Sequence, residues 1–213
     1  MRILYTSATG MAAQELNVQV ISNNIANMRT TGYKRQRVEF QDLLYEHVSR
    51  IGTQTSAQGN KLPVGIDLGG GVKTVGTPRL MTQGTLSKTG SSLDLAIRGE
   101  GFFKIQLPDG SYAYSRDGSF QMDAQGRIVT AQGNVVSPGI TIPQNATGLT
   151  INAQGQISVT PQGSTTPTVV GQLSLTRFIN QAGLLPIGDN MFTESAASGT
   201  PQDGQPNTDG AGD

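Results

Sequence analysis

The 213-residue chain contains no cysteine, no tryptophan and a single histidine, His47. The absence of cysteine excludes disulfides, thiolate metal ligands and cysteine nucleophiles. One histidine offers no histidine pair for a metal ion, and the sequence has no Gly-x-Ser-x-Gly elbow that would support a Ser/His/Asp triad. We therefore predict no catalytic residue, no metal site and no cofactor, and we expect that the protein is not an enzyme.

An excess of charge of either sign is also missing, because fifteen basic residues balance fifteen acidic ones. Such a chain has no long-range field to gather nucleic acid or an anionic membrane. The N-terminus turns polar at Thr6 and Ser7, too early for a secretory signal, and no window approaches the roughly 20 apolar residues of a membrane span. If the protein leaves the cytoplasm, it needs a route without a cleaved signal peptide.

Large apolar side chains are scarce: 35% of residues are hydrophobic and 5% aromatic, against 28 glycines and 10 prolines. This composition argues against one large core and favours short β elements joined by turns. The expected fold class is α+β, mainly β, with a long N-terminal helix, an extended connector and a small β-rich domain. The predicted segments are 1–48 (helical), 49–85 (connector), 86–194 (β-rich) and 195–213 (flexible tail).

Apolar residues recur at helical spacing from about Ile3 to Met28, which predicts an amphipathic helix. Ser7 and Gln14 interrupt the heptad pattern, so one face forms an imperfect coiled-coil-like seam. A helix with one apolar face is marginal alone, and we expect this seam to be buried against other helices. The seam residues are Leu4, Met11, Val18, Ile21, Ile25 and Met28.

The helix is predicted to end near Asn27, because two threonines and Gly32 follow. Phe40, Leu43, Leu44 and His47 then fall at helical spacing and predict a short second helix.

Residues 49–84 are rich in Gly, Thr and Gln and are expected to run extended along a neighbour's surface. Apolar residues alternate in 93–98 and 103–107, which predicts strands, and Asp109-Gly110 and Asp117-Gly118 are hairpin signals. The segment 123–128 is echoed by 152–157, which predicts two similar hairpin turns.

The run Ser22-Asn23-Asn24-Ile25-Ala26-Asn27, followed by Thr30-Thr31-Gly32-Tyr33-Lys34, closely resembles the N-terminal signature of the flagellar axial proteins of rod and hook. The resemblance extends over nearly the whole chain. Within the family, the connector and the run Ile140-Thr141-Ile142-Pro143 are most similar to distal rod members. Further matching segments are 40–45, 92–97, 99–103, 114–120, 126–130 and 133–136.

This resemblance implies a structural subunit of the flagellar basal body. Such a subunit is exported unfolded through the type III apparatus without a cleaved signal peptide, and it stacks helically in the periplasm into a rod that transmits torque from motor to hook. The implied partners are copies of itself, proximal rod and hook proteins, the surrounding ring proteins and the export apparatus. No nucleic acid and no small-molecule substrate are implied.

The resemblance also implies that the signature residues set the turn from the inner helix into the outer layer. Asparagine amides both donate and accept hydrogen bonds, so they suit bonding to backbone at a subunit contact, but they also suit simple helix termination. Both interpretations remain open. The signature-turn residues are Asn23, Asn24, Asn27, Thr31 and Gly32.

In the family the N-terminal helix packs against a C-terminal helix of the same chain, whereas this sequence ends at Asp213 before any such helix. Either the sequence is a truncated form or the helix pairs only with neighbours, and truncation is the favoured interpretation. The nearest alternative function is a proximal rod or hook protein. An alternative of another class is a periplasmic cell-wall hydrolase, which would need paired carboxylates in a groove. Its candidates are Asp94, Asp109, Asp117 and Asp123.

Overall fold

The computed structural model describes residues 2–49, 51–52, 64–163 and 166–206. The chain divides into two compact units. Unit 1 comprises Met1–Met28 and Arg35–Leu80, and unit 2 comprises Arg29–Lys34 and Met81–Asp213. The fold is mainly β with one N-terminal α-helix, as the composition predicts. The boundaries of the four predicted segments stay a prediction, but the structure differs from what was expected within the connector and the tail.

Unit 1 contains the predicted N-terminal helix, α1 (Arg2–Ala26). It buries only Ala13 and Val20 completely, while Thr9, Leu16 and Asn24 on the same side are half-buried. These residues recur at intervals of three and four, so they form one stripe along the helix. Among the described residues, no helix is long and apolar enough to cross a membrane.

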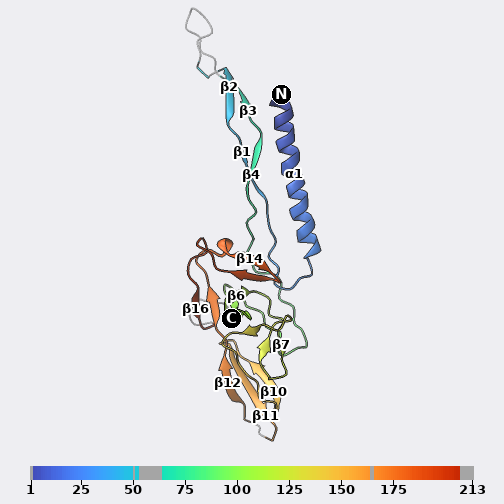
Figure 1. The fold of residues 1–213 in the computed structure, drawn as a ribbon, viewed down its shortest axis with the longest axis vertical. Coiled ribbons are helices and arrows are strands. Elements are labelled where there is room, and N and C mark those ends of the chain that lie inside the picture. The colour runs from blue at the N-terminus through green and yellow to red at the C-terminus, as the bar shows by residue number, and fades with distance from the viewer. Residues whose placement is uncertain (1, 50, 53–63, 164–165, 207–213) are drawn as a thin grey trace, which may run out of the picture. The chain divides into compact units, whose positions relative to one another are not determined.

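The stripe of α1 faces a two-stranded antiparallel ribbon, which runs beside the helix in Figure 1. β1 (Glu39–Asp42) pairs with β4 (Val72–Gly76), and β2 (Tyr45–Ser49) pairs with β3 (Ile66–Gly69). The predicted second helix is therefore wrong. Residues 66–76 supply hydrogen-bonding partners for this stretch, and its Phe, Tyr and Val residues suit a strand, so the short helical spacing was coincidental.

The connector prediction is also corrected, because residues 66–76 are the second half of this ribbon. Residues 53–63, in the middle of the predicted connector, lie outside the described residues.

Glycines kink the ribbon where β3 passes into β4. Leu43 N–H donates to Gly71 O (2.9 Å), and Gly70 N–H donates to Leu44 O (3.1 Å), so the pairing continues through the kink. Gly71 has φ +113°, and a Cβ there would collide with Thr9 Oγ1 of α1. Only glycine therefore allows the kink to lie this close to the helix.

Unit 2 contains two β-sheets, which occupy the lower part of Figure 1. The larger sheet has the order β14-β15-β6-β5-β9-β8-β7, with β13 on β5 and β16 on β13. The smaller sheet has the order β10-β11-β12. The larger sheet's strands are β5 (Phe102–Gln106), β6 (Tyr112–Ser115), β7 (Gln121–Met122), β8 (Ile128–Val129), β9 (Val135–Val136), β13 (Leu175–Arg177), β14 (Leu185–Gly188), β15 (Met191–Thr193) and β16 (Gln202–Gly204). The smaller sheet consists of β10 (Ala146–Ile151), β11 (Gln156–Pro161) and β12 (Thr168–Gln172), and a 3-10 turn, η1, spans Gln181–Gly183.

One apolar cluster joins the two sheets of unit 2. Phe103 and Val136 of the larger sheet pack in the same cluster as Ile157 and Val159 of β11. A second cluster is mainly aromatic, with Phe102, Tyr114, Phe178 and Phe192 in edge-to-face contacts. The core is therefore built from inward-facing residues of short strands, as the scarcity of apolar residues suggested.

The predicted turns of unit 2 are partly confirmed. Asp109-Gly110 connects β5 to β6, with Gly110 N–H donating to Leu107 O (3.0 Å). Asp117-Gly118, in contrast, is not a hairpin turn. It leads from β6 toward β7, and Leu95 N–H donates to Gly118 O (2.9 Å). A Cβ at Gly118 would collide with Leu95 O, so the backbones approach too closely for a side chain.

The strand predicted over 93–98 is reduced to one isolated bridge, between Asp94 and Ser119. Ile97 is buried in the core, so the alternating apolar residues are used for packing without a continuous ladder.

The echo between 123–128 and 152–157 is confirmed as two hairpin turns with the same hydrogen bonds. Asp123 Oδ1 accepts from the N–H groups two and four residues later (2.9 and 2.8 Å), and Asn152 Oδ1 does the same (3.1 and 2.8 Å). Gly126 and Gly155 have φ +81° and +75°. The repeat therefore encodes a side-chain-capped turn.

The flexible tail predicted from Ser195 is wrong for residues 195–206. β16 pairs with β13, and the Asp203 carboxylate accepts from the Thr176 hydroxyl and from Lys104 Nζ (2.6 Å). Burial by itself raises the pKa of Asp203, but the hydrogen bonds from Lys104 and Thr176 and the charge of Lys104 outweigh it, so the net pKa is lowered. The polar composition of residues 195–206 did not predict β16, because this strand is stabilised by an ionic contact and not by burial of apolar side chains. Residues 207–213 lie outside the described residues.

We predict that Asp203→Asn destabilises unit 2 by roughly 1 kcal/mol at pH 7, because a hydrogen-bonded charge is lost at a half-exposed site. A lowered folded-state pKa stabilises the fold above the unfolded pKa of about 3.9, and this contribution is lost as pH falls through the folded pKa. The difference between parent and variant should therefore shrink below about pH 4. Denaturant unfolding at several pH values measures it, with Asp189→Asn as a control of equal charge change. A difference that is the same at pH 3 and pH 7 would refute the ionic contact.

Candidate assembly surfaces

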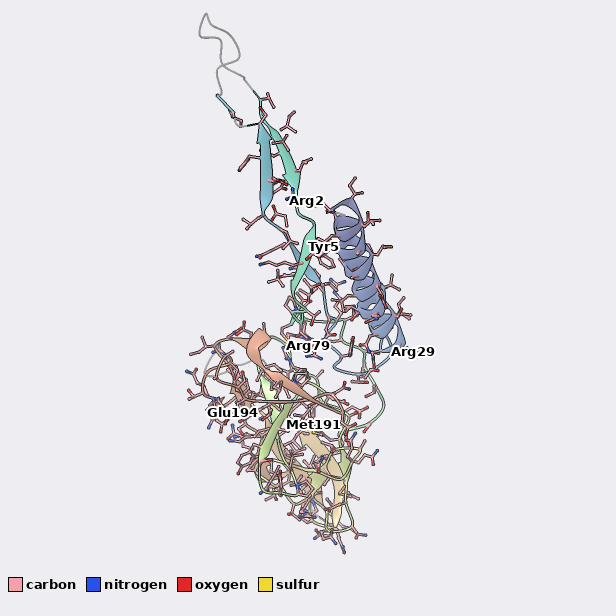
Figure 2. The ribbon with its side chains drawn as sticks, turned by 45° about the horizontal axis from the view of Figure 1, so that its top comes forward. Arg2, Tyr5, Arg29, Arg79, Met191 and Glu194 are labelled. Carbon is pink, nitrogen blue, oxygen red and sulfur yellow. The ribbon has the colours of Figure 1, made fainter. Side chains whose placement is uncertain are left out.

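Five of the six seam residues lie on the side of α1 turned away from the ribbon, and Met28 lies in the turn that follows the helix. At about 100° per residue, the centre of the seam is about 140° from the stripe that faces β4. The seam side chains are between 48% (Ile21) and 78% (Met28) exposed. Figure 2 shows α1 with the ribbon along one side only. The helix therefore has one apolar face that its own chain leaves uncovered among the described residues.

The ribbon-facing stripe is smaller and more polar than the seam. Val72 N–H approaches Thr9 Oγ1 at 3.5 Å, and Arg2 forms an ion pair with Glu46 of β2. Small Ala13 lets the backbones approach, and Val20 supplies apolar contact. The two faces of α1 consequently differ in chemistry as well as in partner.

Asn24 makes the most specific contact of the signature. Its amide donates to Gln36 O (2.8 Å), and its Oδ1 accepts from Gln36 N–H (3.0 Å). Gln36 in turn forms a β-bridge with Arg79. The side chain therefore acts as a short strand partner that fixes the chain after it has reversed direction beyond α1.

Asn23 and Asn27 lie at the end of α1. Asn27 N–H donates to Asn23 O (3.1 Å), and Asn27 Nδ2 donates to the same oxygen (3.0 Å). These bonds satisfy a carbonyl of the last helical turn. Asn27 thus bonds to the end of its own helix, and Asn24 bonds to backbone of the same chain. A role of these amides at a subunit contact stays a prediction.

Thr31 and Gly32 belong to unit 2. Thr31 O accepts from Asn190 Nδ2 (2.9 Å). Gly32 has φ +72°, and a Cβ on it would lie 2.8 Å from Asp117 N. The five signature-turn residues are therefore divided between unit 1 and unit 2.

Gln36, Ser115 and Asn190 contribute to these contacts and were not singled out by the sequence reasoning. Ser115 is buried, its Oγ donates to Asn190 O (2.9 Å), and it accepts from Asp117 N–H (3.0 Å). The run Gly188-Asp189-Asn190 between Ile187 and Met191 is a turn signal that could have located the hairpin, although nothing local links it to Thr31.

Two basic side chains of unit 2, those of Lys34 and Arg116, follow Gly32 in the sequence or belong to the Arg116–Asp117 peptide that Gly32 approaches. Lys34 Nζ donates to Thr82 O (2.8 Å), and burial, followed by the nearby charge of Arg116, lowers the pKa of Lys34. Burial also lowers the pKa of Arg116, against the opposing effect of Glu100. Arg116 donates to Gly99 O. These cations are thus committed to backbone carbonyls of unit 2.

Three of the four carboxylates considered for catalysis serve turns, and Asp94 lies in the isolated bridge with Ser119. Asp109, Asp117 and Asp123 each accept from the N–H two residues later, at 2.9, 3.0 and 2.9 Å. His47 Nδ1 lies 2.6 Å from Asp67 Oδ1 as an exposed cross-strand pair. Within the described part of the chain, no group of three or more His, Cys, Asp or Glu residues is placed to hold a metal ion.

Two family models match the chain. Residues 4–34 match the family described as "Flagella basal body rod protein", which covers α1 and the signature. Residues 96–159 match "Flagellar hook protein FlgE/F/G D1 domain", which covers the first half of the β-rich part of unit 2.

Curated relatives match over nearly the whole chain. The flagellar basal-body rod protein FlgG of Caulobacter vibrioides is 55% identical over 93% of this chain and 76% of its own length. FlgG of Buchnera aphidicola subsp. Acyrthosiphon pisum is 48% identical over 98% of this chain and 80% of its own length. The hook protein FlgE of Helicobacter pylori is 38% identical over 64% of this chain, but over only 19% of its own length.

We predict that Asn24→Ala destabilises unit 1 by about 1–2 kcal/mol, because it removes the hydrogen bonds to both the N–H and the C=O of Gln36. The measurement is the thermal unfolding of the helical circular dichroism signal. Ser22→Ala, on an exposed position of the same helix, is the matched control and should change little. Equal midpoints for Asn24→Ala and the parent would show that the clamp contributes nothing.

Proposed function

Because the chain belongs to the family of flagellar basal-body rod proteins named FlgG, we propose that it is a structural subunit of the flagellar distal rod and not an enzyme. Copies of the chain stack helically into a tubular drive shaft that passes torque from the motor to the hook. The rod lies in the periplasm, and the subunit reaches it through the flagellar export apparatus without a cleaved signal peptide.

The observation that carries the proposal is the uncovered seam of α1. Burying the exposed part of such apolar side chains contributes about 1–2 kcal/mol each, which is ample to drive association once several are covered together. The ribbon-facing stripe is already occupied within the chain, so it does not compete for the same partner. The seam is therefore the surface by which α1 joins helices of neighbouring subunits in the rod core.

The ribbon offers a second apolar surface for neighbouring copies. Tyr45, Val48, Ile66 and Leu68 of β2 and β3 are each more than half exposed. An isolated two-stranded ribbon is marginally stable in water, and contact with a neighbour would stabilise it. We propose that this surface contacts an adjacent subunit, while other surfaces meet the proximal rod, the hook and the surrounding ring proteins.

Two observations favour this function over the alternatives. The match with this chain covers little of the hook relative's length, whereas it covers most of the length of the rod relatives. Asp109, Asp117 and Asp123 are engaged by their own turns, which supports a structural role for these carboxylates rather than hydrolysis.

We predict that Val18→Glu abolishes rod assembly, because burying an unpaired carboxylate in an apolar seam costs several kcal/mol. The gene for this chain carries the substitution in otherwise motile cells, and rods are counted in isolated basal bodies by electron microscopy. Ala12→Glu, exposed on α1 but outside the seam, is the matched control and should build rods. Normal rod numbers with Val18→Glu would overturn the proposed role of the seam.

A further inference from the structure

Residues 29–34 follow directly on the last turn of α1 yet pack as part of unit 2. Three contacts hold them there. Asn190 donates to Thr31 O, Gly32 lies against the Arg116–Asp117 peptide, and Lys34 donates to Thr82 O. The first two contacts meet at adjacent residues, so the backbone of Thr31-Gly32 is held from two sides.

Asn190 is itself fixed before it reaches Thr31. It occupies the two-residue turn between β14 and β15, with φ +58°, and Asp189 beside it has φ +50°. The buried Ser115 hydroxyl donates to Asn190 O and accepts from Asp117 N–H. A series of hydrogen bonds therefore connects Asp117 through Ser115 and Asn190 to Thr31. Gly32 packs against the Arg116–Asp117 peptide, at the start of this series.

Gly32 is needed here for two separate reasons. Its φ of +72° is in the left-handed region that favours glycine. In addition, a Cβ would lie 2.8 Å from Asp117 N and 2.9 Å from Arg116 C, and neither backbone atom belongs to a flexible side-chain end. The close seat of Gly32 therefore depends on the absence of a side chain.

The contacts at Thr31 and Gly32 are to the backbone of the segment, whereas Lys34 contributes through its side chain. The hydrogen bond to Thr31 O and the close packing of Gly32 fix the position of the backbone. Neither depends on the side chain of Thr31. Such contacts resist sliding of the segment over unit 2, since a small shift breaks a directional hydrogen bond and brings Gly32 against a peptide group.

We propose that Asn190 is a positioning residue that anchors residues 29–34 on unit 2, so that load carried by α1 enters unit 2 at Thr31-Gly32. This inference rests on the proposed function as a torque-transmitting subunit. Ser115 holds Asn190 in place by donating a hydrogen bond to Asn190 O, and Gly32 lets the segment pack closely against the Arg116–Asp117 peptide.

The test uses Asn190→Gly, which retains the left-handed backbone conformation but removes the amide donor. Asp189→Gly, in the same turn, is the matched control. Because the chain has no cysteine, Arg29→Cys can carry a single nitroxide label. We expect faster nitroxide motion in Asn190→Gly and unchanged motion in Asp189→Gly. Within the same segment, Tyr33 N–H donates to Thr30 O (3.3 Å). Exchange of this amide hydrogen should be about two- to tenfold faster in Asn190→Gly, because the loss of the Asn190–Thr31 hydrogen bond makes opening of the segment easier.

A general loss of stability would also speed exchange in the core strands β5 and β6, whereas loss of the anchor leaves these strands at the parental rate. Unchanged label motion and Tyr33 exchange in Asn190→Gly would overturn the anchor. So would equal acceleration throughout unit 2.

Load transfer at Thr31-Gly32 is tested in cells that produce the unlabelled protein. Rods of the Asn190→Gly variant should be as numerous as parental rods but should lose rotation when a large bead is attached to the filament, while Asp189→Gly rods keep rotating. Parental rotation under load in Asn190→Gly overturns load transfer at this point. If the unsubstituted chain forms no rods, the proposed function fails, and the label and exchange measurements still decide whether the anchor exists.

Discussion

The structure depends on one helix whose two faces make different demands. The stripe of Thr9, Ala13 and Val20 is satisfied by the ribbon of the same chain, while the seam presents large apolar side chains to water. Exposed apolar surface of this extent is costly, and a helix of this kind gains most of its stability from packing. The ribbon therefore packs against one side of α1 and leaves its apolar face uncovered among the described residues. In the proposed function, folding of the chain and assembly use opposite sides of this helix.

Backbone-directed contacts define the course of the chain as it leaves this helix. Asn24 forms hydrogen bonds with the backbone N–H and C=O of Gln36 in unit 1, and Asn190 donates a hydrogen bond to Thr31 O in unit 2. Glycines supply the complementary requirement, since Gly71 in unit 1 and Gly32 in unit 2 sit where a Cβ would collide. Three signature residues, Asn24, Thr31 and Gly32, thus lie where backbone is hydrogen-bonded or closely approached.

Sequence patterns predicted the elements that depend on residues close together in the sequence. The helical repeat located α1, alternation located β5, and the duplicated Asx-Ala-Gln-Gly pattern located two equivalent turns. The ribbon was missed because its pairing, such as Phe40 with Thr74, joins segments far apart in the sequence, and a run of four apolar positions can fit a helix by chance. Asn190 was missed for the same reason, as 159 residues separate it from Thr31.

Methionine oxidation by dilute hydrogen peroxide tests the central claim, that the seam is buried on assembly, most directly. Met11 and Met28 lie in the seam, Met122 is exposed in unit 2, and Met191 is buried in its core. Peptide mass spectrometry should find Met11 and Met28 oxidised in the purified chain but protected in isolated basal bodies, with Met191 protected in both. Equal oxidation of Met11 and Met28 in the purified chain and in assembled rods would contradict the account.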